Sequence, residues 1–196
     1  MDFSKDDACR IFSNCNLAPR TSRIAEYWLS IWDGECLPAR ASIAPTQIKS
    51  LLSGVIIFRV VPGQSVTVRM AGTGHYAVLK FELTGQDWLA ATSRKDQSAR
   101  LAILSDVARG GMALGRWIFP QKFGREIRCE KLLLPLRPES GDSGIPVLGF
   151  IDWAPGIEYG ADISLQKIPL PDAICHIESR HHAPGRSDGA PTHVEG

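Results

Sequence analysis

Hydrophobic residues recur along the chain with two different periods, which separate helical stretches from extended ones. Over residues 21–33 they fall on one face of a helix. Thr21 or Ser22 is expected to cap this helix, and Gly34 to end it. A second, short helix is predicted over about 45–54. The apolar stripe of the first helix consists of Ile24, Tyr27, Trp28, Ile31 and Trp32.

Extended runs rich in β-branched residues follow this helical region. Two of them, at about 55–61 and 65–71, flank the turn at residues 62–64 and predict a β-hairpin. After the hairpin the pattern predicts short helical turns over 75–92. A more regular helix is expected over about 93–109, with a capping box at Ser93 at its start. Strands are predicted over 112–119, 125–136 and 145–153.

The order of these elements predicts an α+β fold built on an antiparallel sheet, because the βαβ alternation of a parallel sheet is missing. The run 55–61 is apolar on both faces, so both faces of the sheet need a cover. Central helices can cover one face, and the stripe of residues 21–33 can cover the other, from the same chain or from a partner. We expect residues 1–19 to be flexible, 20–159 to form one domain, and 160–196 to be a disordered tail.

Charge and cysteine content narrow the class of protein. The 196 residues carry a formal net charge of +1, which gives no broad attraction to nucleic acid or to an anionic membrane. No run of about 20 apolar residues is present, as a membrane span would need. The five cysteines are scattered without a CxxC pair, a pattern typical of reduced thiols in a cytoplasm. We therefore expect a cytoplasmic protein without a metal site, a nucleic-acid partner or a membrane partner.

Two short motifs are similar to catalytic signatures but lack the rest of their sites. Residues 72–77 fit the GxGxxA pattern of a dinucleotide fold, yet no parallel strand ending in an acidic residue is predicted after them. Residues 141–146, GDSGIP, are similar to a serine-protease motif, but His75 upstream lacks the expected setting. A sharp strand-to-helix turn and a polar hairpin loop are the favoured interpretations. We predict no catalytic residues, and an enzyme of small-molecule metabolism using residues 72–75 is the alternative.

A set of residues on the strands and at the strand-to-helix turn could bind a small ligand, and the sequence does not identify a cofactor. Arg69 lies among apolar neighbours and could clamp an anion. Trp117 and Trp153 fall on late strands and could line a pocket between sheet and helices. The favoured interpretation is that both tryptophans are core residues, and the alternative for Arg69 is that it is exposed or paired within the chain. The predicted ligand-binding residues are Arg69, Thr73, His75, Tyr76, Trp117 and Trp153.

Several short motifs occur in an order that is similar to that of one protein family. They are Tyr27-Trp28, Gly34 with Leu37-Pro38-Ala39-Arg40, Ile48 to Leu52, Arg69-Met70-Ala71-Gly72-Thr73, and Glu82-Leu83-Thr84-Gly85. Over about 26–153 the chain resembles the single-domain PAS proteins of alphaproteobacteria. The resemblance implies a five-stranded antiparallel sheet in the order 2-1-5-4-3, with helices between the second and third strands, to which this chain adds an N-terminal helix. It also implies sensing or protein interaction and no catalytic residues.

These observations predict a PAS-type sensory or interaction module that acts in trans on another bacterial signalling protein. A structural adaptor without a ligand is a further alternative. The stripe of residues 21–33 is too apolar to leave in water, because each large side chain contributes roughly 1.5–3 kcal/mol when buried. We expect this stripe to form a homodimer interface through Ile24, Tyr27, Trp28, Ile31 and Trp32.

Overall fold

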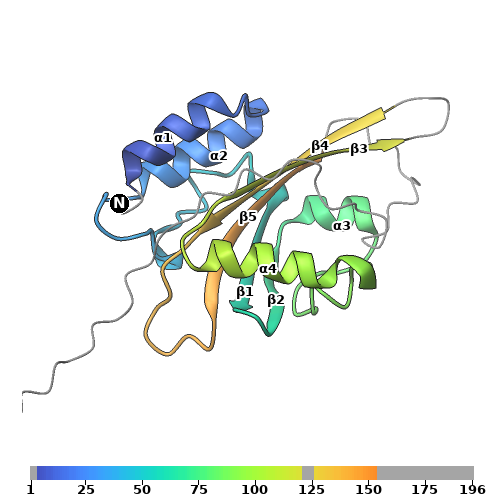
Figure 1. The fold of residues 1–196 in the computed structure, drawn as a ribbon. Coiled ribbons are helices and arrows are strands. Elements are labelled where there is room, and N and C mark those ends of the chain that lie inside the picture. Colours follow the sequence, from blue (N-terminus) through green and yellow to red (C-terminus); the bar gives the residue numbers. More distant parts are fainter. Residues whose placement is uncertain (1–3, 121–125, 154–196) are drawn as a thin grey trace, which may run out of the picture.

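A five-stranded antiparallel sheet forms the centre of the structure (Figure 1). The computed structural model describes residues 4–120 and 126–153. Every neighbouring pair of strands is antiparallel, so the predicted sheet and its strand order are confirmed. The strands are β1 (Val55–Val61), β2 (Ser65–Ala71), β3 (Ala113–Pro120), β4 (Glu126–Pro135) and β5 (Ile145–Trp153), in the order β2-β1-β5-β4-β3.

The β1–β2 hairpin has the bounds that the sequence predicts. Gly63 takes a positive φ of 73° in its turn, and the Gln64 amide donates a hydrogen bond to the Val61 carbonyl at 2.9 Å. The register of the pair shifts within the hairpin, which leaves Arg69 of β2 without a partner on β1. The Gly63 amide also donates to Ser105 Oγ at 2.9 Å, so the turn is fixed to the helix that covers the sheet.

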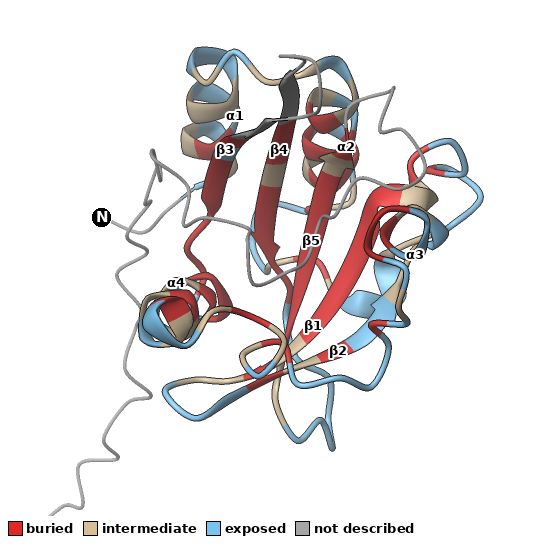
Figure 2. Ribbon diagram, turned by 90° about the vertical axis from the view of Figure 1, so that its right-hand side faces the viewer, coloured by how far each residue is buried: buried red, intermediate tan, exposed pale blue. Residues whose placement is uncertain are grey.

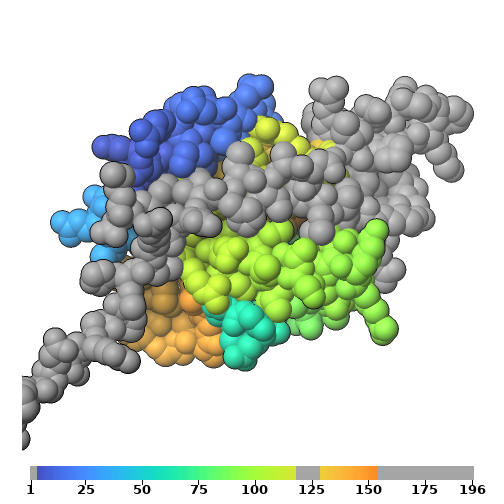
Figure 3. All heavy atoms as spheres, in the orientation of Figure 1, coloured from blue at the N-terminus to red at the C-terminus, as the bar shows by residue number. Residues whose placement is uncertain are grey.

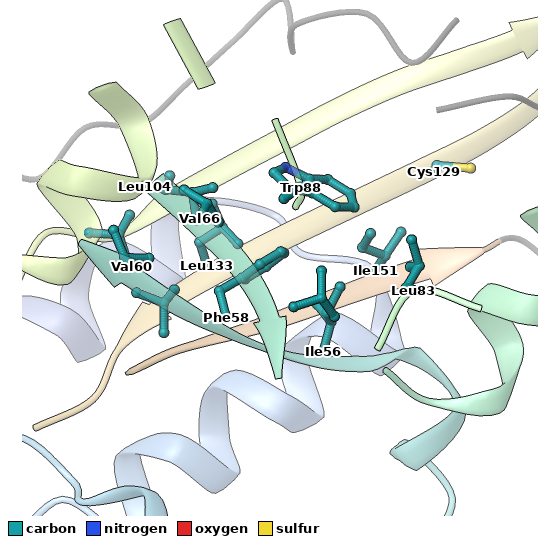
Figure 4. Packing of buried hydrophobic residues seen from close by; sticks show 14 of the residues in the cluster. Ile56, Phe58, Val60, Val66, Leu83, Trp88, Leu104, Cys129, Leu133 and Ile151 are labelled. Carbon is teal, nitrogen blue, oxygen red and sulfur yellow. The ribbon is translucent and has the colours of Figure 1, made fainter. Parts of the chain in front are cut away.

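Two helices and a short 3-10 turn cover one face of the sheet, which we call the α4 face. They are α3 (Thr73–Leu79), η3 (Arg94–Asp96) and α4 (Gln97–Ala108). Strand side chains such as Phe58, Leu133 and Ile151 pack under them with Leu83, Trp88 and Leu104 (Figure 4). The atoms of α4 form a continuous band across this side of the molecule (Figure 3).

The opposite face of the sheet, which we call the α2 face, is covered by α1 (Lys5–Asn14) and α2 (Pro19–Ser30), as Figure 1 shows. Trp28 of α2 is fully buried, and its Nε1 donates to the Pro135 carbonyl of β4 at 3.0 Å. Phe12 of α1 meets the Trp28 ring edge-on at 6.5 Å. Both faces of the sheet are therefore covered by the same chain. Strands β1 and β5 are buried almost throughout, whereas β2 at the edge of the sheet is partly exposed (Figure 2).

The stripe predicted as a dimer interface is part of this internal core. Ile24, Tyr27, Trp28 and Trp32 are buried within the single chain, and Ile31 is half-buried. The sheet of the same chain supplies the cover that the stripe needs, so these side chains do not form a free surface for a second copy. We correct the predicted interface on this ground, while the homodimer itself stays a prediction.

The expectation of a flexible segment over residues 1–19 is wrong for Lys5–Asn14, which form α1. A capping box begins this helix: Ser4 Oγ accepts from the Asp7 amide at 3.2 Å, and the Ser4 amide donates to the Asp7 carboxylate at 3.1 Å. Ala8 faces the core and is fully buried. The next helix begins at Pro19, earlier than the predicted cap at residues 21–22.

Two further boundaries differ from the predictions. Residues 45–54 form tight turns that end in η2 (Leu52–Gly54), in which amides bond to carbonyls three residues back, such as Leu51 to Ile48 at 2.8 Å. Another 3-10 turn, η1 (Arg40–Ser42), precedes them. Ser93 makes no side-chain cap, and α4 continues from η3 instead. The predicted tail, 160–196, lies outside the described residues.

Candidate functional site

The glycines at the end of β2 allow α3 to begin against the backbone of η2. A Cβ on Gly72 would overlap the Leu52 carbonyl oxygen and lie 2.7 Å from the Ser53 carbonyl oxygen. A Cβ on Gly74 would lie 2.6 Å from the same Ser53 oxygen. The Gly-x-Gly spacing therefore serves close backbone packing at a strand-to-helix turn, which is the interpretation that the sequence favoured over nucleotide binding.

His75 lies in the first turn of α3 and is 1% exposed. Its Nε2 lies 3.1 Å from the Val55 carbonyl oxygen of β1, and the Nε1–H of Trp153 on β5 donates to its Nδ1 at 3.1 Å. Since Nδ1 accepts, Nε2 carries the proton and donates to Val55. This neutral tautomer connects α3 to two strands of the sheet, and both of its ring nitrogens are engaged.

Burial lowers the pKa of His75 to about 4, because the imidazolium would lose its hydration inside the core. The backbone carbonyls of Val55 and Gly54 oppose this effect, and the positive charge of Lys131 adds to it. The ring is therefore uncharged at neutral pH. A proton acceptor for catalysis near pH 7 would need a higher pKa and a free nitrogen, and His75 has neither.

A pocket of about 310 Å³ opens beside α3. His75 forms part of its wall, while Thr73 and Tyr76 are exposed around it, and Tyr76 is 57% exposed. Of the described lining residues only Glu82 carries a charge at neutral pH. The lining consists of Ala71, Gly72, Thr73, His75, Tyr76, Glu82 and Leu83.

The other predicted ligand residues lie outside this pocket. Trp153 connects to it through His75, and Trp117 meets Trp153 edge-on at 6.4 Å; both tryptophans are buried in the core of the α4 face. Arg69 is exposed on β2 and does not line the pocket. The structure thus brings Thr73, His75 and Tyr76 together and places the two tryptophans behind them.

Lys131, a half-buried lysine on β4, was not among the predicted site residues. Its Nζ lies 5.7 Å from the centre of the Phe58 ring and 5.1 Å from that of Trp88. Each ring favours the ammonium form by roughly 0.5–2 kcal/mol. Burial and the nearby Arg100 guanidinium outweigh the rings and lower the pKa of Lys131 to about 7. The alternation of Cys129, Lys131 and Leu133 along the strand was the signal that could have placed it inside.

The second candidate motif, GDSGIP, begins in the loop between β4 and β5. Arg59 Nη1 donates to Ser143 Oγ at 3.0 Å, so the serine of GDSGIP is held in the β4–β5 loop, far in sequence from His75. Within residues 4–120 and 126–153, no three His, Cys, Asp or Glu side chains gather as a metal site. No helix in those same ranges is long and apolar enough to cross a bilayer.

Solved structures overlap with part of this chain. A fungal LOV domain photoreceptor matches at 15% identity and a TM-score of 0.36, over 53% of this chain and 76% of its own. The PAS domain of an HTR-like protein from Haloarcula marismortui matches at 13% identity and 0.35, over 56% and 90%. A PAS domain from Colwellia psychrerythraea matches at 13% identity and 0.37, over 56% and 95%. At such TM-scores the overlaps are partial.

No curated protein matches the chain. The sequence profile of the PAS domain matches residues 17–152, a segment that runs from the start of α2 almost to the end of β5. This segment covers most of the chain and all five strands of the sheet. The chain therefore belongs to the PAS domain family.

Proposed function

We propose that this protein is a sensory module that binds a small molecule in the pocket beside α3 and passes the binding event to its sheet. The observation that supports this proposal is the position of His75, which is at once a wall of the pocket and a bridge to β1 and β5. A ligand that moves α3 changes both hydrogen bonds. We further propose that the module acts in trans on another signalling protein in the bacterial cytoplasm.

The lining of the pocket favours a neutral or cationic ligand over an anion. His75 is uncharged at neutral pH because burial lowers its pKa to about 4, and Glu82 supplies a negative charge at the rim. Tyr76 offers an exposed aromatic face, on which a flat or cationic group can lie. Arg69 is exposed on β2 and does not line this pocket, so it is not an anion clamp for the ligand.

We infer binding rather than catalysis from the engagement of His75. Both ring nitrogens are hydrogen-bonded inside the chain, so no lone pair points at a substrate in the pocket. An enzyme that uses the Gly72–His75 region would need this ring to rotate out of two bonds. A structural adaptor without a ligand remains the competing interpretation, and the following experiment distinguishes it from a sensor.

Native mass spectrometry of the protein purified without refolding tests the proposal. We expect a bound species below about 1 kDa, the size range that a pocket of a few hundred Å³ accepts. Tyr76→Ala should lose the species, because it removes the exposed wall of the pocket. Met70→Ala is the matched control, since Met70 is 44% exposed but does not line the pocket. Wild-type protein that carries no species in any preparation would support the adaptor instead.

A further inference from the structure

Lys131 occupies an unusual position for a lysine, on the α4 face of the sheet. In the registers of β4 it lies opposite Gly115 of β3 and Ile151 of β5, neither of which brings a polar side chain. Its Nζ lies above Phe58 and Trp88, at 5.7 Å and 5.1 Å from the ring centres. The amine is therefore surrounded by apolar groups on the strands and the covering segment, while its side chain stays partly open to solvent.

Two basic residues on the covering helices interact electrostatically with Lys131. Arg100 of α4 acts on it electrostatically, and Lys131 in turn acts on His75 of α3. The carboxylate of Asp96 lies 3.9 Å from the Arg100 guanidinium. Among the ion pairs of the described residues none includes Lys131. A half-buried amine among apolar groups and outside these ion pairs loses part of the hydration that favours its ammonium form, and desolvation of this kind activates a lysine as a nucleophile.

We propose that Lys131 is a reversible attachment site for small aldehydes, with which its amine forms an imine. The Nζ lone pair attacks the carbonyl carbon and forms a carbon–nitrogen bond. The two hydrogens of the amine leave with the carbonyl oxygen as water, and a carbon–nitrogen double bond remains. No oxidant or reductant takes part, and hydrolysis reverses the step. This site shares no residue with the pocket beside α3, so it stands apart from the proposed function.

Lys131 should react faster than the exposed lysines because more of it is unprotonated. Burial and Arg100 lower the pKa of Lys131 to about 7, so about half of it is neutral at pH 7. An ordinary lysine with a pKa near 10.4 is neutral in roughly one molecule of 2,500 at that pH. A less basic amine is a weaker nucleophile, so we expect an advantage of at least about tenfold rather than a thousandfold.

The test is reductive trapping of the folded, full-length protein with acetaldehyde and cyanoborohydride, followed by peptide mapping. Hydride converts each imine to a stable ethylamine, so the early rate at every lysine can be compared. Lys95 is exposed in η3 and serves as the internal control. At pH 7 we expect Lys131 to be modified at least about tenfold faster than Lys95. We also expect the ratio of the rate at Lys131 to that at Lys95 to fall as the pH rises from 7 to 10, because only Lys95 gains much neutral amine over that range.

Two results would overturn the inference. One is a rate at Lys131 equal to or below that of Lys95 at pH 7, and the other is a pH profile that parallels the control. Lys131→Arg keeps a cation without a primary amine, so it should lose the fast phase and leave the rate at Lys95 unchanged. The wild-type comparison is sufficient if that variant folds poorly, because both lysines are measured in the same molecule.

Discussion

At the scale of single residues, His75 connects the candidate pocket to the sheet. The sequence drew attention to it as a histidine beside a strand-to-helix turn, but periodicity alone could not identify its partners. Trp153 lies 78 positions away, and only the sheet brings its Nε1 to His75 Nδ1. For Lys131 the local pattern was informative, because the alternation of the strand places it on the same face as Cys129 and Leu133. It was still missed, because a charged residue is not expected on a buried face.

The first prediction is a loss of stability in acid that depends on His75. Its pKa is 6.5 in the unfolded chain and about 4 in the fold, so unfolding takes up a proton between these values. Stability from this group is complete above pH 6.5 and falls as the pH drops toward 4, by up to about 3 kcal/mol. Urea unfolding of wild type and His75→Gln at several pH values measures it. The difference in their free energies of unfolding should shrink as the pH falls.

The carboxylates of the chain titrate in both proteins and cancel in that difference. A gap between wild type and variant that is constant from pH 7 to 4 would mean that His75 is charged or exposed in the fold. In that case the bridge to Val55 and Trp153 would be wrong as described.

At the scale of elements, the strand-to-helix turn after β2 depends on Gly72. We predict that Gly72→Ala lowers the free energy of unfolding by about 2–3 kcal/mol, because its Cβ meets the backbone oxygens of Leu52 and Ser53. Thr73→Ala, at the exposed next position, should change it by less than about 0.5 kcal/mol. Chemical denaturation measures both. Equal effects would show that α3 does not pack on η2 as closely as the structure has it.

The connection between the N-terminal helices and the sheet depends on Glu130. This buried carboxylate accepts from the Ala18 amide at 2.9 Å and from Arg116 Nε at 2.6 Å. We predict that Glu130→Gln lowers the free energy of unfolding by about 1–2 kcal/mol, because two bonds to a charged acceptor weaken. The matched control is Asp106→Asn, which breaks an exposed pair with Arg109 at 3.6 Å.

That exposed pair should contribute less than about 0.5 kcal/mol. If both substitutions cost the same in urea unfolding, Glu130 does not hold the N-terminal helices to the sheet.

The sequence could predict α2 from its apolar spacing, but it missed α1, where Ala8 is the only buried position of the described helix. The local signal of α1 lay in its cap, where Ser4 precedes Asp7 by three residues.

At the scale of the whole molecule, the sheet order and the two covered faces could be predicted, and the way the second face is covered could not. Strands that are apolar on both faces require a covering element on the second face of the sheet, and the stripe of α2 was correctly predicted to be that element. Periodicity cannot tell whether such a stripe packs on its own sheet or on a second chain. Trp28 settles the choice here through its burial and its hydrogen bond to Pro135 in the same chain.

We predict that Trp28→Ala destabilises the folded chain itself, by about 3–5 kcal/mol, because it leaves a cavity between α2 and the sheet. Its unfolding midpoint should fall by the same amount at low and at high micromolar protein concentration. A loss that grows on dilution would show that Trp28 stabilises a dimer through the stripe of residues 21–33.

The indole N–H signals of the five tryptophans, measured by ¹⁵N NMR, test the central claim most directly. Spectra are compared for protein purified without refolding and for protein that has been unfolded, dialysed and refolded to remove small molecules. We predict that the Trp153 signal moves between the two samples, because its hydrogen bond to His75 reports on the pocket. The Trp28 signal, from the opposite face of the sheet, should stay in place. Identical spectra for all five indoles would contradict a ligand-binding sensor at this site.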